Sequence, residues 1–287
     1  MSDRHAHPVT STQVVDVFDV DCRAPKSRRG DEEYVRTTQV VVPRRGVFGV
    51  TLSKRRVIAE PTSALVFHED TTYTVDHPSP HGDRCAVFIF RPELLEEALG
   101  GQPRDYGSIN PMTQLTTALL ASPRRDLDDL EFEEAALSVL GMLVDDFSGS
   151  SREVTRGPVQ RQRVAQVRGL LASSPQERWT LDSVAKEMHV SAFHLAHQFR
   201  AITGTTIGQY ILRLRLAIVL EQMVEGRQSL GALAAEAGFA HHSHLTERFR
   251  SVFGITPSAS RSLLTARRVT DMRRVIDEQA LKGPNDV

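Results

Sequence analysis

The stretch LDSVAKEMHVSAFHLAHQFRAITG, residues 181–204, decides the fold because it returns 50 residues later as GALAAEAGFAHHSHLTERFRSVFG, residues 231–254. At this offset the same or similar residues align: Ala185 with Ala235, Leu195 with Leu245, Phe199 with Phe249, Arg200 with Arg250, Ile202 with Val252, Gly204 with Gly254 and Thr206 with Thr256. A repeat at a fixed period indicates one supersecondary unit built twice. Each copy predicts a short helix, a tight turn and a second helix that ends at glycine.

The first copy has the spacing of a helix-turn-helix. Its first helix places apolar residues at i, i+3, i+4 and i+7, namely Leu181, Val184, Ala185 and Met188. A turn then leads to Ser191, which can cap a second helix from Ala192 to about Thr203. Gly204 follows as a stop signal. Two short amphipathic helices joined by such a turn predict a helix-turn-helix unit.

The outer face of each second helix carries the candidate DNA contacts, because this helix enters the major groove in helix-turn-helix proteins. The candidates are Ser191, Phe193, Ala196, His197 and Arg200 in the first copy and His242, Ser243, His244, Glu247 and Arg250 in the second. Histidine and serine can hydrogen-bond base edges, Glu247 can accept from a cytosine amino group, and Phe193 can touch a thymine methyl group. Arginines near the helix ends can reach phosphates.

The segment between the copies, from Ile207 to Met223, contains no proline and is followed by Gly226. It predicts one helix of 17 residues. At about 1.5 Å per residue this helix is roughly 25 Å long. It could therefore separate two recognition helices by about one turn of DNA, ~34 Å from centre to centre, on one face of the duplex.

Three further motifs lie within about Val164 to Arg268. They are Gly208-Gln209-Tyr210-Ile211 with Arg213, Arg215 and Ala217, Ala234-Ala235-Glu236-Ala237-Gly238-Phe239, and Phe249-Arg250-Ser251-Val252-Phe253-Gly254-Ile255-Thr256-Pro257. Together they resemble the AraC/XylS family of bacterial transcription regulators. The resemblance implies base contacts at Phe193, Ala196 and His197 and at His242, Ser243, His244 and Glu247. Thr203 departs from the pattern, since the second copy has Phe253 there, and Ser260 stands where an aromatic residue commonly precedes the arginine. Ala196 offers no hydrogen bond, so the first unit is expected to read bases less strictly.

The charge distribution agrees with a DNA-binding C-terminal part. From Val159 to Arg268 there are 14 Lys and Arg and 7 Asp and Glu, a formal charge of +7. The rest of the chain therefore carries −8, because the whole chain carries −1. A basic block on an acidic protein is the electrostatic footprint expected for DNA binding.

Cysteine content and hydropathy predict a cytoplasmic protein. The chain has only two cysteines, Cys22 and Cys85, so no disulfide framework is expected. The polar N-terminus has no apolar signal region, and no apolar run approaches the 18 residues of a membrane helix. No cofactor motif is present.

From Val14 to about Arg91 the pattern changes to short runs rich in Val, Ile, Phe and Thr. The clearest are residues 37–42, 46–52, 64–68, 73–75 and 85–90. Closely spaced short strands predict a β-sandwich or small barrel. The family resemblance implies that this part is a cupin-like sensor domain. The predicted fold class is thus α+β and multidomain, with a cupin-like β-sandwich or barrel, a helix pair, and an all-α domain of two helix-turn-helix units joined by a long helix.

The only constellation typical of a metal site lies in this β part, at His68, His77, His81, Asp83 and Cys85. Imidazole and carboxylate groups suit iron or zinc. The alternative, which we favour from the sequence alone, is a turn between strands with surface histidines. His241, His242 and His244 do not match a zinc spacing, and no cysteine or carboxylate completes a set. We therefore assign no metal ligand from the sequence.

Helices are expected at Pro92 to Leu99, Pro111 to Ala121, Leu127 to Phe147 and Gln160 to Ala172. The pair at 111–147 could pack on the sandwich or on a second subunit, and the sequence leaves both open. We expect the domain limits to be a disordered N-terminus at 1–12, a sensor and dimerisation domain at 13–147, a linker at 148–158, a DNA-binding domain at 159–268 and a tail at 269–287. Gly100 to Asn110 is expected to be a loop.

The predicted function is sequence-specific regulation of transcription. The family resemblance implies an unknown small-molecule effector, contact with RNA polymerase, activation and a possible homodimer. No Ser/His/Asp or Cys/His catalytic set, P-loop or dinucleotide fingerprint is present, so an enzyme is not expected. The alternatives are a cupin-type metal-binding enzyme or a metal or redox sensor fused to a DNA-binding domain, and a constitutive DNA-binding protein whose N-terminal part only dimerises.

Overall fold

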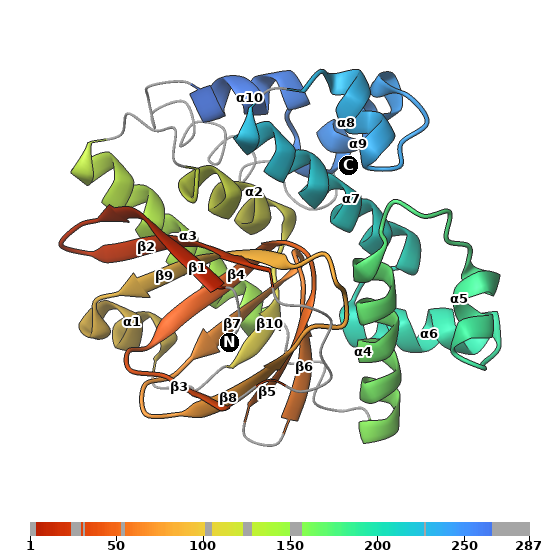
Figure 1. The fold of residues 1–287 in the computed structure, drawn as a ribbon, viewed down its shortest axis with the longest axis horizontal. Helices are drawn as coiled ribbons and strands as arrows, with labels where there is room; N and C mark the ends of the chain where they lie inside the picture. Colours follow the sequence, from red (N-terminus) through yellow and green to blue (C-terminus); the bar gives the residue numbers. More distant parts are fainter. Residues whose placement is uncertain are drawn as a thin grey trace.

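The computed structural model describes residues 4–23, 30, 32–52, 55–100, 105–122, 128–149, 157–226 and 228–265. Its N-terminal half is a sandwich of two antiparallel sheets (Figure 1). The first sheet contains, in spatial order, β1 (Arg4–Ser11), β2 (Val15–Cys22), β9 (Asp83–Phe90), β4 (Gln39–Arg45), β7 (Ser63–Phe67) and β10 (Tyr106–Ser108). The second contains β3 (Glu32–Tyr34), β8 (Thr72–Asp76), β5 (Phe48–Leu52) and β6 (Arg55–Ala59).

The central strands of the first sheet, β9, β4 and β7, are buried on both faces, which explains their nearly continuous apolar runs. On β9, Phe88 and Phe90 face the helices, while Cys85 and Val87 face the interior of the sandwich. Successive residues of a strand point to opposite faces, so one strand serves two cores. The interior core adds Phe48, Leu65 and other apolar residues of both sheets.

Three helices cover the outer face of the first sheet: α1 (Pro92–Leu99), α2 (Pro111–Leu120) and α3 (Asp129–Gly149). The side chain of Asn110 caps α2 by accepting from the backbone N–H groups of Met112 and Thr113 at 2.7 and 3.1 Å. Asp146 of α3 in turn accepts from the Asn110 side chain at 2.9 Å. The pair thus packs within the subunit, although Leu130 and Leu137 of α3 are 67% and 39% exposed.

The described residues of the C-terminal half form helices and no strand. It contains α4 (Pro158–Ser173), α5 (Leu181–Glu187), α6 (Ala192–Thr203), α7 (Ile207–Glu225), α8 (Leu230–Glu236), α9 (His242–Phe253) and α10 (Pro257–Thr265). The pairs α5–α6 and α8–α9 are the two predicted units, and α7 joins them (Figure 1). The predicted fold class is confirmed. Among the described residues, no helix has the length and apolar character needed to cross a membrane.

The repeat differs from the sequence alignment in one respect. Its offset is 50 residues in the second helices but 49 in the first, since Ala185 corresponds to Ala234 and not to Ala235. Each of these two alanines is buried and accepts the same turn hydrogen bond, from Val190 in the first unit and from Phe239 in the second. The second turn therefore contains one extra residue before its cap.

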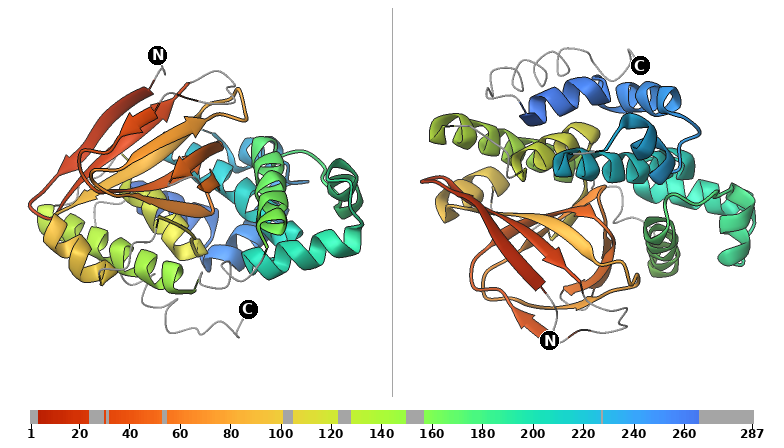
Figure 2. Two further views of the ribbon diagram at one scale, coloured as in Figure 1. Left: turned by 90° about the horizontal axis from the view of Figure 1, so that it is seen from below. Right: turned by 45° about the horizontal axis from the view of Figure 1, so that its top comes forward.

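The two halves pack directly on each other through α7, which lies against β4 and α2 (Figure 2). Glu221 of α7 forms a bidentate ion pair with Arg44 of β4, at 3.0 and 2.8 Å. Arg84 of β9 donates to the same carboxylate at 2.8 Å and to Glu225 at 3.1 Å. The side chains of Arg44 and Glu221 are each 2% exposed, so the interface contains a buried charged pair.

Several expectations need correction. The N-terminus expected to be disordered at 1–12 forms β1, which pairs with β2, and the loop expected at Gly100–Asn110 contains β10. His77 was expected at the surface but is buried. The helix α3 extends to Gly149 and α4 begins at Pro158, so both enter the linker expected at 148–158. Residues 150–156 of that linker and the tail at 269–287 lie outside the described residues.

Candidate DNA-binding interface

The first recognition helix, α6, is fixed at both ends by its sequence. At its start, Ser191 accepts a hydrogen bond from the backbone N–H of His194 at 3.3 Å. At its end, Gly204 adopts a φ of 75°, and its N–H donates to the carbonyl of Arg200. Its inner face is fully buried, at Leu195, Phe199 and Ile202. The opposite face is thereby held towards solvent.

The exposed face of α6 carries most of the residues proposed from the first copy. Phe193 is 76% exposed, and its ring stacks on that of His197 with centroids 6.4 Å apart. Arg200 is also exposed. Ala196 is half-buried beside them, and the Ser191 hydroxyl is engaged in capping. Of the proposed residues, His197 and Arg200 are therefore the long polar side chains available for contact here.

The second recognition helix, α9, repeats this geometry. His241 caps it, and its Nδ1 accepts from the His244 N–H at 3.1 Å. The exposed face contains His242, Ser243, Glu247 and Arg250. His244 is only half-exposed and lies edge-on to Phe239, with centroids 5.6 Å apart. It is the least accessible of the proposed residues on this helix.

Sequence reasoning missed two exposed residues on these faces. His194 on α6 and Arg248 on α9 are both exposed. The Nε of Arg248 lies 3.4 Å from the Nε2 of His244, one turn earlier. Their helical positions adjoin those already chosen, so a full count of the outer face could have found them.

The two units are also fixed relative to each other. Arg215 of α7 donates to the carbonyls of Pro175 and Glu177, which precede α5, each at 2.7 Å. It donates as well to the carbonyl of Gly238, in the turn of the second unit, at 3.1 Å. A Cβ on Gly238 would lie 2.6 Å from the carbonyl oxygen of Gln176, so the two units touch at their backbones. At ~1.5 Å per residue, the 19 residues of α7 span roughly 28 Å.

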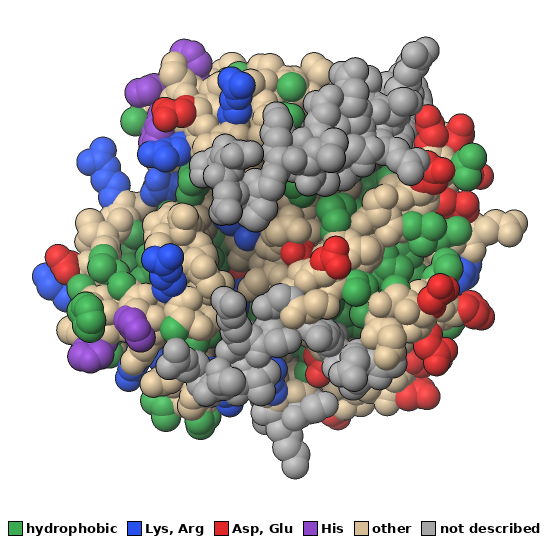
Figure 3. Space-filling view, turned by 180° about the vertical axis from the view of Figure 1, so that it is seen from behind, with side chains coloured by type: hydrophobic (Ala, Val, Ile, Leu, Met, Phe, Trp, Pro, Cys, Tyr) green, Lys and Arg blue, Asp and Glu red, His purple; other side chains and the backbone are tan. Residues whose placement is uncertain are grey.

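The surface charge has the expected polarity. Figure 3 shows histidine, lysine and arginine side chains along one edge of the molecule and acidic side chains along the opposite edge. The exposed histidines and arginines of α6 and α9 belong to the basic part of the chain. A basic edge on a chain of net charge −1 attracts and orients a polyanion.

Residues 184–262 match the model of a helix-turn-helix domain family. A putative AraC-like transcription regulator of Streptomyces antibioticus is 32% identical over 94 residues, which are 33% of this chain and 31% of that protein. The C-terminal half contains an AraC-type helix-turn-helix domain. The AraC-type domain also resembles that of AdaA of Bacillus subtilis, a bifunctional transcriptional activator and DNA repair enzyme, at 28% identity over 30% of this chain and 41% of AdaA.

Beyond the AraC-type domain the similarity is distant. ToxT of Vibrio cholerae is 13% identical, with coverage of 89% of this chain and 99% of ToxT and a TM-score of 0.37. The matched stretch spans about a third of the length of the curated relatives that it matches.

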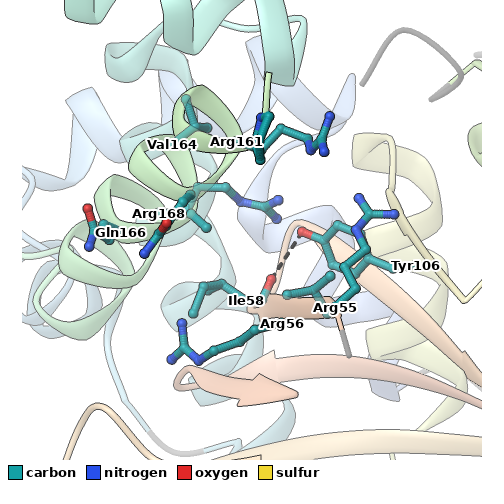
Figure 4. A pocket seen from close by; sticks show the side chains of 12 residues that line it. Arg55, Arg56, Ile58, Tyr106, Arg161, Val164, Gln166 and Arg168 are labelled. Carbon is teal, nitrogen blue, oxygen red and sulfur yellow. Dashed lines mark hydrogen bonds between the residues drawn. The ribbon is translucent and has the colours of Figure 1, made fainter. Parts of the chain in front are cut away.

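A cleft lies between the β-sandwich and the AraC-type domain, with a volume of about 370 Å³. Figure 4 shows its walls: Arg55, Arg56, Ile58 and Tyr106 on one side, and Arg161, Val164, Gln166 and Arg168 of α4 on the other. The Tyr106 hydroxyl donates to the Ile58 carbonyl at 3.0 Å. Arg168 is buried, pairs with Glu60 and lies 5.3 Å from the Tyr106 ring centroid. Arginines from both halves give the cleft the chemistry to hold an anion.

The residues considered for metal binding divide into two groups. His77 and Asp83 come together, and both line a cavity of about 60 Å³ inside the sandwich, with Cys22 and Cys85. His68 instead lies 3.4 Å from Asp105, and His81 is exposed. Hydrogen bonds with Asp83 and Cys22 raise the pKa of His77 to about 10. Burial raises the pKa of the Cys85 thiol.

Proposed function

We propose that this protein is a transcription regulator that binds double-stranded DNA by inserting α6 and α9 into successive major grooves. The observation that carries the proposal is the pair of matching helices with buried inner faces and exposed polar outer faces. Arg215 and α7 support it, because they connect the two units by a rigid helix and by hydrogen bonds to the loop before α5 and to the turn of the second unit. Two recognition helices fixed in this way favour DNA sites with two half-sites about one helical turn apart.

Each exposed side chain receives a role from its chemistry. His197 and Glu247 lie in the middle of their helices and would contact base edges, with Glu247 accepting from a cytosine amino group. His242 and Ser243 at the start of α9 would add base contacts. Arg200 and Arg250, in the last turn of each helix, would contact phosphates. Phe193 would contact a thymine methyl group.

The N-terminal domain, with limits near residues 13 and 147, would act as the sensor. It contacts α7 through Arg44 and Glu221, so a change in the sandwich would reach the helix that joins both DNA-binding units. A small-molecule effector in the cleft between β6 and α4 would touch both halves at once. Such a ligand shifts the balance between two arrangements only if it binds them unequally. We further propose a cytoplasmic protein without catalytic activity, which contacts RNA polymerase as an activator and forms a homodimer.

The test is fluorescence anisotropy with duplexes that cover the regions upstream of its own and neighbouring genes. His197→Ala and Glu247→Ala should each weaken binding to the preferred duplex by about 1–3 kcal/mol, or about 5- to 150-fold, and leave binding to random duplex unchanged. Glu236→Ala is the matched control, since Glu236 is exposed on α8 rather than on a recognition helix. Equal losses on preferred and random DNA for Glu247→Ala would remove its assignment as a base-reading residue.

A further inference from the structure

A thiol, an imidazole and a carboxylate lie close together at one corner of the β-sandwich. Cys22 is the last residue of β2, Asp83 is the first residue of β9, and the two are direct cross-strand partners. His77 follows β8 in the other sheet. All three residues are buried, at 7%, 5% and 7% exposure for Cys22, Asp83 and His77. The fold thus brings to Cys22 two donor residues that are 55 or more residues away from it in the sequence.

The chain between His77 and Asp83 is held tightly against β2. Gly82 has a φ of 69°, a conformation that favours glycine. A Cβ on Gly82 would collide with the carbonyl oxygen of Cys22, and a Cβ on Gly46 would lie 2.7 Å from the Cα of Asp83. Two glycines therefore permit the close approach that brings the three donors together.

The three donor groups lie close together, and the two shortest contacts between them use different nitrogens of the His77 ring. The Cys22 Sγ lies 3.8 Å from the His77 Nε2, and the His77 Nδ1 lies 3.0 Å from an Asp83 carboxylate oxygen. For one choice of ring nitrogen, the three donor atoms all lie within 4.8 Å of one another. Two ligands of one tetrahedral zinc ion are about 3.3–3.6 Å apart, given bond lengths of about 2.0–2.3 Å. Small side-chain movements would complete such a site.

We propose that Cys22, His77 and Asp83 bind a divalent transition-metal ion of the zinc class. A thiolate, a neutral imidazole and a carboxylate are the donor types that zinc uses in proteins. The thiolate and the carboxylate supply two negative charges, which a divalent cation neutralises in a buried site. Three protein ligands leave a fourth position, on the side of the cavity that Cys85 also lines.

The same three groups in a row could instead activate Cys22 as a nucleophile, with His77 as base and Asp83 as its orienting partner. The burial of Cys22 argues against this role, because reactive cysteines are partly exposed to their reagents. A bound metal ion needs only a path of entry and is stable in a closed site. The observations therefore favour the metal site, and the reactive thiol becomes an outcome of the test.

The experiment uses the full-length protein, stripped of metal with a chelator and titrated with Co²⁺. The expected result is one equivalent bound, with a sulfur-to-cobalt charge-transfer absorption that Zn²⁺ displaces. Cys22→Ser should abolish the charge-transfer band, and His77→Asn should weaken Co²⁺ binding by at least about tenfold. His81→Asn is the matched control, since His81 is exposed in the same segment and should retain full binding.

Two measurements separate failure of the site from failure of the variants to fold. The wild-type protein alone should gain thermal stability on addition of Zn²⁺, because a ligand bound only by the folded state stabilises it. Zn²⁺ should also protect Cys22 from iodoacetamide. No charge-transfer band in the wild-type protein, a band that persists in Cys22→Ser, or alkylation at the same rate with and without Zn²⁺ would overturn the proposal. None of these readouts depends on DNA binding.

Discussion

The buried ion pair between the two halves provides the sharpest test of their packing. In Glu221→Gln, the side chain keeps its size but loses its charge, so Arg44 remains buried beside Asp19, at 3.7 Å, as its nearest remaining carboxylate. Removal of one partner of a buried pair typically costs about 3–5 kcal/mol. We expect a loss of that size in the free energy of unfolding, since the side chains of Arg44 and Glu221 are each 2% exposed.

The matched control is Glu225→Gln, one helical turn further along α7. Glu225 also accepts from Arg84, at 3.1 Å, but its side chain is 51% exposed. Solvent-exposed pairs contribute about 0–1 kcal/mol, so this variant should remain within 1 kcal/mol of the wild type. Urea denaturation of the full-length protein, followed by far-UV circular dichroism, gives both values.

A second comparison separates loss of charge from loss of packing. The double variant Arg44→Met, Glu221→Leu should recover most of the stability lost in Glu221→Gln, because an apolar pair of similar volume often replaces a buried ion pair without a net cost. If Glu221→Gln and Glu225→Gln were equally stable, Glu221 would be solvated in solution. The docking of α7 on β4 would then be refuted.

Four further variants test the helical domain. Gly204→Ala should lower the free energy of unfolding by about 1–2 kcal/mol, since Gly204 has a φ of 75° with open space around it. Gly208→Ala, in the first turn of α7 and also in open space, should instead raise the free energy of unfolding by up to about 1 kcal/mol. If urea denaturation gave changes of the same sign for both variants, the assigned backbone conformation would be contradicted. Thr206→Ala should lower the free energy of unfolding by about 1 kcal/mol, because the Thr206 hydroxyl caps α7 by accepting from the Gln209 N–H at 3.2 Å. If thermal denaturation showed no change in this variant, the cap would not contribute to stability. Arg250→Gln should weaken binding to preferred and random DNA alike and reduce the slope of log affinity against log salt by about 1, whereas a selective loss on preferred DNA would make Arg250 a base-reading residue.

Local sequence patterns predicted the helical domain well, because the helix signals lie within a few residues of each other. The cap at Ser191 and the stop at Gly204 are both short-range features. The extra residue in the second turn was missed because the second helices of the two units align at an offset of 50 residues. At that offset Ala185 aligns with another alanine, Ala235, so the alignment shows no mismatch there.

The strand β1 was missed for a different reason. Its sequence from Arg4 to Ser11 is polar and its residues are mostly exposed, so no apolar alternation marks it. It is a strand because its backbone pairs with β2 at the edge of the sheet. Main-chain pairing of an exposed edge strand does not require an apolar side-chain pattern, so the sequence does not predict the strand.

The interior sites depend on long-range contacts that no local pattern contains. Glu221 looks like an ordinary solvent-facing residue of α7 until Arg44, 177 residues earlier, is placed beside it. The metal candidates chosen from the sequence did not include Cys22, and only the register of β2 against β9 places it opposite Asp83. His77 looked exposed because it precedes a proline in an apparent turn, yet the turn folds back into the sandwich.

The central claim is that α6 and α9 read one DNA site together. The most direct measurement is selection of binding sites from a random duplex library by the full-length protein, followed by anisotropy of the enriched duplex at two salt concentrations. We expect an enriched site with two half-sites about one helical turn, ~34 Å, apart, bound much more tightly than a scrambled duplex at both salt concentrations. Enrichment of a single half-site, or equal binding of enriched and scrambled duplexes, would contradict the account.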